Sequence, residues 1–472
     1  MPVIARRYWL VLATASLGML LASLDFSVNV GLPEIANSFD ANLTSIYKII
    51  TVYLGATATV QLILGRVADV YGLKRIYILG LLVYGVAVFL IGVATTLESV
   101  ITTRILQALG NAVFLALSPA IVTASVPDRY RGQALGWMTA IGMIGMILGS
   151  FGAGFMIDHY GWRWIFLARV PLTILALGMS LWFLPRIRRS SEANLDLISG
   201  LLIVASIFFL MLFLHQTPST GWLSSSSIIY LASSLITFCC LLRRQVTISK
   251  PFIPKGLLRR RAVSLGLICN FLMYLAIFVN WFVLPFFVAE IVGMGPTSIG
   301  VFLTIPAMFL LIASPFGGAL ADRTHPALVS TLGMVIIVVC LGSFQSVDHL
   351  STSFGFAVRM AGLGVGMGIF QSSNLSLIMG NVSTHELGIA GGLSGLSRNL
   401  GTVCSVVFLG AIFVTLKTTG QDLGGASSAQ TIDAVTIYIG AFKFVYGIAA
   451  AIGFLGAILN FWLWRNRKTD SY

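Results

Sequence analysis

Charged residues are scarce in this chain of 472 residues. Asp, Glu, Lys and Arg make up 10% of the sequence and hydrophobic residues 57%, whereas a soluble domain is about 25% charged. A water-soluble fold with so little charge would leave too much apolar surface facing solvent. A lipid bilayer removes this difficulty because its interior is as apolar as leucine. The composition therefore excludes an ordinary soluble protein and predicts a membrane protein.

Sequence motifs for metal binding, catalysis or nucleic-acid binding are also missing. None of the five cysteines has CxxC spacing and the five histidines form no ligand cluster, so we expect no metal site and no cofactor. The absence of HExxH, GxSxG and Walker motifs argues against a membrane-embedded enzyme, and against ATP as the source of energy. The net charge of +13 comes without a zinc-finger or RNA-binding signature, which argues against nucleic acid as a partner.

Fourteen apolar segments follow one another along the chain. Each has roughly the 17–25 residues that a helix needs to cross hydrocarbon, and none alternates in polarity as the strands of a membrane barrel do. Their approximate bounds are 8–34, 44–65, 74–96, 99–125, 132–157, 163–184, 196–214, 226–242, 262–290, 297–321, 327–346, 351–379, 387–416 and 437–464. We therefore predict an all-α polytopic membrane protein with fourteen transmembrane helices.

The distribution of Lys and Arg predicts how these helices are oriented. With a cytoplasmic N-terminus, 21 of the 29 basic residues fall in cytoplasmic loops or tails, four at outer helix ends and four inside spans. Basic residues are retained on the cytoplasmic side, so the bias predicts an inner-membrane protein with both termini in the cytoplasm. The segments 196–214 and 226–242 could form a re-entrant pair, but the basic stretches on both sides fit two full crossings better.

A weak internal repeat divides the chain into two halves. Arg104 and Arg359 are 255 residues apart, Asp69 and Asp322 253, and the Leu-Pro pairs at 32 and 284 are 252 apart. Similar offsets in the same order predict two six-helix bundles with a site between them. The expected organisation is an N-terminal bundle (1–190), two inserted helices (191–245), a basic cytoplasmic loop (246–261) and a C-terminal bundle (262–472). The basic loop is expected either to lie along anionic lipid headgroups or to be a generic topogenic loop.

Five local motifs resemble those of a known family. Residues 65–75 read Gly-Arg-Val-Ala-Asp-Val-Tyr-Gly-Leu-Lys-Arg, and residues 24–33 read Leu-Asp-Phe-Ser-Val-Asn-Val-Gly-Leu-Pro. The others are Arg104-Ile-Leu-Gln107 with Gly110, the glycines Gly142, Gly145 and Gly149, and the stretch 161–171 with Arg169. Together they resemble the major facilitator superfamily, specifically its fourteen-helix drug:proton antiporters, over nearly the whole chain. The resemblance implies a proton-coupled exporter of amphiphilic drugs, acting as a monomer on small-molecule substrates among membrane lipids.

Polar residues inside the spans are the candidates for proton coupling and substrate binding, because a charge in hydrocarbon costs about 2.5–3.5 kcal/mol on insertion scales. The set is Asp25, Asn29, Glu34, Arg104, Gln107, Arg169, Arg359 and Arg398. Protonation would remove most of this penalty for Asp25, which makes it a natural proton carrier; a structural hydrogen bond or salt bridge is the alternative. Glu34, at an outer helix end, is more simply a solvated terminus.

The arginines of this set are expected to pair with acids, carbonyls or water. Arg104 would tune the proton site, Arg359 would occupy the matching place in the second bundle, and Arg398 is a further cavity candidate; each could instead be a packed structural charge. Four arginines lie within spans against one deep acid. This ratio favours anionic or zwitterionic amphiphiles over cations as substrates.

Two further sets of residues suggest how the protein moves. The gating set, with Asp69 expected to pair with Arg129 or Arg131, would clasp the cytoplasmic side shut; it comprises Gly65, Asp69, Gly72, Lys74, Arg75, Arg129 and Arg131. Gly142, Gly145 and Gly149 share one helix face and are expected to slide against the small residues of span 297–321. The simpler interpretation of the gating set is a basic loop that only sets the membrane topology, and the simpler interpretation of the glycines is ordinary helix packing. The alternative function is proton-coupled import or export of a specific metabolite. The excess of arginines over acids within the spans favours an anionic one.

Overall fold

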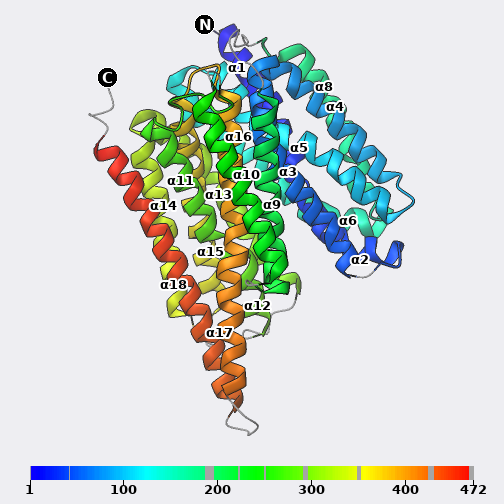
Figure 1. Cartoon of the computed structure of the whole chain (residues 1–472), viewed down its shortest axis with the longest axis vertical. Helices are drawn as coiled ribbons and strands as arrows, with labels where there is room; N and C mark the ends of the chain where they lie inside the picture. The colour runs from blue at the N-terminus through cyan, green and yellow to red at the C-terminus, as the bar shows by residue number, and fades with distance from the viewer. Residues whose placement is uncertain are drawn as a thin grey trace.

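The computed structural model describes residues 2–41, 43–186, 196–221, 224–248, 251–290, 296–347, 352–423 and 430–466. All regular elements within these ranges are helical, which confirms the predicted fold class. Thirteen of the helices are long and apolar enough to cross a membrane. Together with the 29-residue α3, they match the fourteen predicted spans. Both ends of the chain lie at the same end of the molecule (Figure 1).

Six spans form the N-terminal half. They are α1 (Pro2–Ser23) with α2 (Phe26–Ser38), α3 (Leu43–Tyr71), α4 (Leu73–Gly92), α5 (Leu97–Ser125), α6 (Arg131–Tyr160), and α7 (Trp164–Leu167) with α8 (Arg169–Phe183). The turn between α3 and α4 consists of Gly72 alone, whose φ of 103° is a conformation that other residues rarely adopt. The first span is broken at Leu24 and Asp25, and this break positions the site described below.

The C-terminal half repeats this arrangement. Its spans are α11 (Arg261–Ile277) with α12 (Val279–Glu290), α13 (Pro296–Arg323), α14 (Pro326–Ser343), α15 (Ser353–Gly380), α16 (Leu387–Cys404) continued through a π-helical turn into α17 (Gly410–Leu423), and α18 (Gln430–Arg465). Here the first span is broken at Phe278, 253 residues after Asp25. The core of this half is aromatic, with Phe287 and Phe442 rings 4.1 Å apart and Phe442 and Tyr446 rings 4.4 Å apart.

Two more spans, α9 (Leu197–Thr220) and α10 (Ser225–Thr247), lie between the halves in the sequence. They pack on each other, and each of Ser206 and Ser234 bonds the backbone carbonyl of the other. Asp196 caps α9 and accepts from Arg244 at 2.8 and 3.0 Å. The Arg244 hydrogen bond lowers the pKa of Asp196 to about 2. Both helices are long enough to cross a membrane.

Candidate functional site

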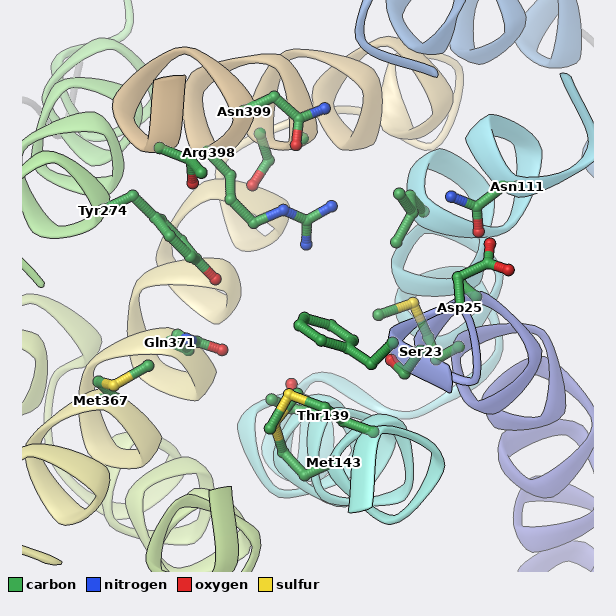
Figure 2. Close-up of a pocket in the computed structure, with 18 of the residues that line it drawn as sticks. Ser23, Asp25, Asn111, Thr139, Met143, Tyr274, Met367, Gln371, Arg398 and Asn399 are labelled. Carbon is green, nitrogen blue, oxygen red and sulfur yellow. The ribbon is translucent and has the colours of Figure 1, made fainter. Parts of the chain in front are cut away.

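A cavity of about 420 Å³ lies between the two halves, within the size range of small-molecule sites. Its walls come from α1, α3, α5 and α6 on one side and from α11, α13, α15 and α16 on the other (Figure 2). Most of the lining is apolar and rich in methionine: Met19, Met138, Met143, Met146 and Met367. Methionine side chains adapt their shape, so this wall suits ligands of varied outline.

Asp25 lies at the edge of this cavity because the first span breaks there. Its side chain is only 8% exposed and accepts hydrogen bonds from four residues on three other helices. Gln107 donates to it at 2.9 Å and Arg104 at 3.3 Å, both from α5. Arg169, from α8, and the Tyr53 hydroxyl, from α3, complete the shell. The carboxylate is therefore the centre of a buried polar network.

Arg104 and Arg169 are held in place by further contacts. Arg104 donates to the Gln107 amide oxygen at 2.6 Å, and its guanidinium lies 4.0 Å from the centre of the Tyr53 ring. Arg169 donates to the Leu24 carbonyl at 3.0 Å, an acceptor close to the helix break. Both arginine side chains are 2% exposed. Two buried positive charges thus share one carboxylate, and loss of that negative charge would leave them uncompensated.

Three members of this network could not be identified from the sequence. Tyr53 bonds Asp25, Tyr84 accepts from Arg169 at 3.3 Å, and Ser27 accepts from it at 2.5 Å. Tyr and Ser are common in membrane helices, so only the fold distinguishes these three from the rest. Asn111, 4% exposed in the cavity wall, was also missed; its amide oxygen has no hydrogen-bond partner among the residues described.

The opposite wall carries Arg398. Its side chain enters from α16 and points towards the middle of the cavity (Figure 2). The Tyr274 hydroxyl lies next to it. Asn399 donates to Gln61 at 3.2 Å, which joins α16 to α3 across the interface between the halves.

The structure does not bring the other predicted residues to this cavity. Arg359 donates to the Ser343 carbonyl at 3.1 Å and to Ser346 at 3.0 Å, at the end of α14. Its guanidinium is therefore bound at the end of α14, and Arg359 does not line the cavity as Arg104 does. Glu34 is exposed on α2, and the side chain of Asn29 lies outside the part of the structure that is described.

Two aspartates connect the halves at the end that holds both termini. Asp69, 4% exposed at the end of α3, accepts from the backbone N–H groups of Gly388 and Ile389 at 2.8 and 2.9 Å. Asp322, at the end of α13, accepts from Gly132 and Gln133 at 2.7 and 2.8 Å. Each carboxylate therefore caps a helix of the opposite half, where the helix dipole favours negative charge.

These caps correct the expected pairing of Asp69 with Arg129 or Arg131. Arg131 pairs instead with Asp128, and the Arg129 guanidinium lies 4.6 Å from the Tyr130 ring. Two free N–H groups at the start of α16 lie closer to Asp69 than either arginine, and they satisfy both of its oxygens.

The remaining gating residues support this end of the molecule. Gly65 allows close contact because a side chain there would overlap the Gly388 carbonyl. Lys74 donates to the Leu181 and Leu184 carbonyls at 2.8 and 2.7 Å, within its own half, and Arg75 is exposed.

A salt bridge within the C-terminal half lies beside Asp69. Glu386 accepts from Arg260 at 2.7 Å and from the Ser383 backbone at 2.9 Å. Burial of Glu386 opposes ionisation, but the Ser383 N–H and Arg260 outweigh it, so the pKa of Glu386 lies below its ordinary value. The acid therefore stays ionised at neutral pH, which keeps the bridge to Arg260 intact.

The glycine stripe of α6 faces a different helix from the one predicted. Gly142, Gly145 and Gly149 lie against α1, where a side chain at Gly145 would overlap the Leu20 backbone. The expected contact with α13 is made instead by Gly132 and Gly136, further towards the capped end of α6. The prediction was wrong because the sequence shows that glycines share a face but not which neighbour the face meets.

Comparison with known proteins gives the following matches. The profile of the Major Facilitator Superfamily matches residues 15–405 and, separately, 266–472. The riboflavin transporter RibZ of Clostridioides difficile (strain 630) is 28% identical over 468 residues, 98% of this chain and 99% of RibZ. The methylenomycin A resistance protein of Bacillus subtilis (strain 168) is 28% identical over 405 residues, 85% of this chain and 87% of that protein. The solved structure of the human organic anion transporter MFSD10 (TETRAN) shares the fold, with a TM-score of 0.66 at 12% identity, over 96% of this chain and 99% of that one.

Proposed function

Because the chain belongs to the Major Facilitator Superfamily, we propose that it exports amphiphilic drugs or other toxic small molecules in exchange for protons, by alternating access. It is a membrane transporter and not an enzyme. Resemblance to a methylenomycin A resistance protein supports export of toxic compounds. The observation that carries the proposal is the position of Asp25, a buried carboxylate at the wall of a cavity between two transporter halves.

Asp25 is suited to couple proton binding to movement. In its ionised form it is the counter-charge that Arg104 and Arg169 share, and it joins the first span to α5 and α8. A proton on Asp25 would remove that negative charge and leave two buried guanidinium groups without it, which favours a rearrangement of these helices. The protonation state thus selects between two packings of the N-terminal half.

The aspartate caps supply the second element of the mechanism. Asp69 and Asp322 hold the halves together at one end, and the halves diverge towards the other (Figure 1). With cytoplasmic termini, as the basic residues predict, this arrangement is closed to the cytoplasm. Rocking of the halves would break both caps and open the cavity to the cytoplasm.

Proteoliposomes that contain a pH-sensitive dye test the proposal. Ethidium, riboflavin and fluorescein are offered in turn, and we expect at least one to drive protons in the direction opposite to its own movement. Asp25→Asn should abolish this pH change, while Asp158→Asn, an exposed aspartate on α6, should retain it. Solute movement at wild-type rates without any pH change would refute proton coupling.

Transport of a specific metabolite is the second candidate. Similarity to a riboflavin transporter over 98% of the chain favours it. The same vesicles distinguish the two candidates, since a metabolite carrier would move one member of the panel and leave the others untouched. Accumulation in whole cells as opposed to inverted vesicles then separates import from export.

A further inference from the structure

The cavity carries more positive than negative charge. Asp25, Arg104 and Arg398 are the charged side chains in the described part of its lining, and Arg169 lies directly behind Asp25. Three guanidinium groups therefore face one carboxylate, and the excess grows by one when Asp25 takes up a proton. Because the apolar walls screen these charges little, their field reaches a ligand in the cavity. That field favours an anion in both protonation states of Asp25.

Arg398 differs from the other two arginines because no acid of the described residues pairs with it. Arg104 and Arg169 share Asp25, whereas no carboxylate of the described residues lies within 4.0 Å of Arg398. Its guanidinium points into the cavity, and the Tyr274 hydroxyl is its neighbour (Figure 2). A guanidinium away from bulk water gains most from a carboxylate, sulfonate or phosphate, whose two oxygens match its paired N–H groups.

Polar amides also line the C-terminal wall of the cavity. Asn270 is fixed by its bond to the Ser394 carbonyl at 2.9 Å, and Asn399 by its bond to Gln61 at 3.2 Å. Gln371 faces the same space from α15. These groups can orient a polar head beside Arg398 without adding a charge that would compete for it.

Aromatic residues also line the cavity, and two of them, Phe278 and Trp281, follow Tyr274 along the first span of the C-terminal half. The rings of Phe278 and Trp281 lie nearly parallel, with centroids 5.8 Å apart and an angle of 24° between their planes. Phe26 enters from the opposite half. Flat apolar surfaces of this kind bind aromatic bodies by stacking.

We propose that the substrates of this transporter are aromatic anions, with the acidic group bound by Arg398 and the ring body held between Phe26, Phe278 and Trp281. The proposal rests on the transport function proposed above and names its substrate class. It distinguishes this cavity from one built for lipophilic cations, which would require an unpaired carboxylate.

Equilibrium binding to the purified full-length protein in detergent tests the proposal without any proton gradient. The probes share one ring system and differ in charge: naphthalene-1-acetate, naphthalene-1-acetamide and 2-(1-naphthyl)ethylammonium. We expect the anion to bind at least about tenfold more tightly than the amide or the cation, the effect of one charge-assisted hydrogen bond. Equal or tighter binding of the cation, or no measurable binding of the anion, would overturn the proposal.

Variants of Arg398 locate the effect. Arg398→Gln should weaken binding of the anion about tenfold and leave the amide within about twofold, while Arg398→Lys should retain part of the preference. Arg163→Gln, which removes an arginine that donates to the Ala94 carbonyl outside the cavity, is the matched control. Equal losses for anion and amide in Arg398→Gln would contradict a charge-specific role, and unchanged amide binding verifies that the variant is folded.

The two proposals fail separately. Anion preference in detergent with no proton movement in vesicles would leave the substrate class standing and remove the coupling. Proton-coupled transport of ethidium alone would leave the coupling standing and remove the proposed substrate class.

Discussion

The break in the first span of each half holds a different kind of residue. In the N-terminal half it holds Asp25, which is surrounded by hydrogen-bond donors. At the same place 253 residues later, Phe278 stacks on Trp281. The amide oxygen of the nearby Asn280 accepts a hydrogen bond from the Tyr446 hydroxyl at 3.0 Å. One copy of the repeat is thus equipped to hold a charge, and the other presents an aromatic surface.

The packing between helices, by contrast, is the same in both halves. Gly132 and Gly388, 256 residues apart, each start a helix that is capped by an aspartate from the other half. Gly145 meets the backbone of Leu20 in α1, and Gly401, also 256 residues later, meets that of Phe271 in α11. The two halves therefore share a frame of small residues and caps, and differ in the chemistry placed on it.

The largest expected effect tests the shared frame. Gly145→Leu and Gly401→Leu should both prevent folding, because the new side chain would overlap backbone atoms of the neighbouring helix. Overpacking costs about 1–3 kcal/mol where side chains can give way, and more where, as here, it meets backbone. The measurement is the monodisperse peak in fluorescence-detected size-exclusion chromatography. Gly152→Leu on the same helix, where no atom lies within 4 Å, should give a normal peak. Loss of the peak in only one of the first two variants would show that the frame is not equivalent in the halves.

The second effect tests the difference between the breaks. Asp25→Asn should lower proton-coupled transport at least about 100-fold and reduce the free energy of unfolding by about 3–5 kcal/mol, because two buried arginines lose their counter-charge. Phe278→Asn should weaken substrate binding by roughly tenfold but leave the number of protons moved per substrate unchanged. The readouts are pH changes in proteoliposomes and thermal unfolding. Loss of coupling in Phe278→Asn would remove the distinction.

The sequence predicted the transmembrane helices and the internal repeat better than the contacts between the helices. Hydropathy located the spans, because crossing hydrocarbon imposes a length of apolar sequence that is readable residue by residue. The placement of Lys and Arg predicts how these spans are oriented. The offset of 253 between Asp69 and Asp322 indicated the duplication. Neither cap was predicted with its real partner, since the N–H groups that it satisfies belong to any residue at a helix start and carry no sequence signal.

The network around Asp25 shows the same limit. Asp25, Arg104, Gln107 and Arg169 were identified because polar residues are rare in spans, and the structure brings these four together. Arg359 satisfied the same criterion but lies elsewhere, where it donates to Ser343 and Ser346 at the end of α14. Rarity in the sequence identifies candidates, and the fold decides which of them meet.

The third effect tests the two caps against each other. Asp69→Ala should reduce the population closed at the capped end about tenfold, because it removes two charge-assisted hydrogen bonds from a buried site. Asp322→Ala should act in the same direction but less, since Asp322 is half-buried. Pulsed electron paramagnetic resonance between spin labels at Tyr130 and Thr384, both exposed at this end, reports the closed distance. An unchanged distance distribution in Asp69→Ala would mean that the cap does not hold the halves together.

The smallest effect concerns Arg359, which the repeat matches with Arg104. Arg104→Gln should lower transport more than about tenfold, because it removes both an ion pair with Asp25 and a hydrogen bond to Gln107. Arg359→Gln should lower it less than about twofold, because that arginine bonds Ser343 and Ser346 at a helix end, where water can replace it. Initial rates in proteoliposomes measure both. Equal losses of transport in the two variants would contradict this difference between Arg104 and Arg359. They would mean that Arg359 enters the cavity in another state of the transport cycle.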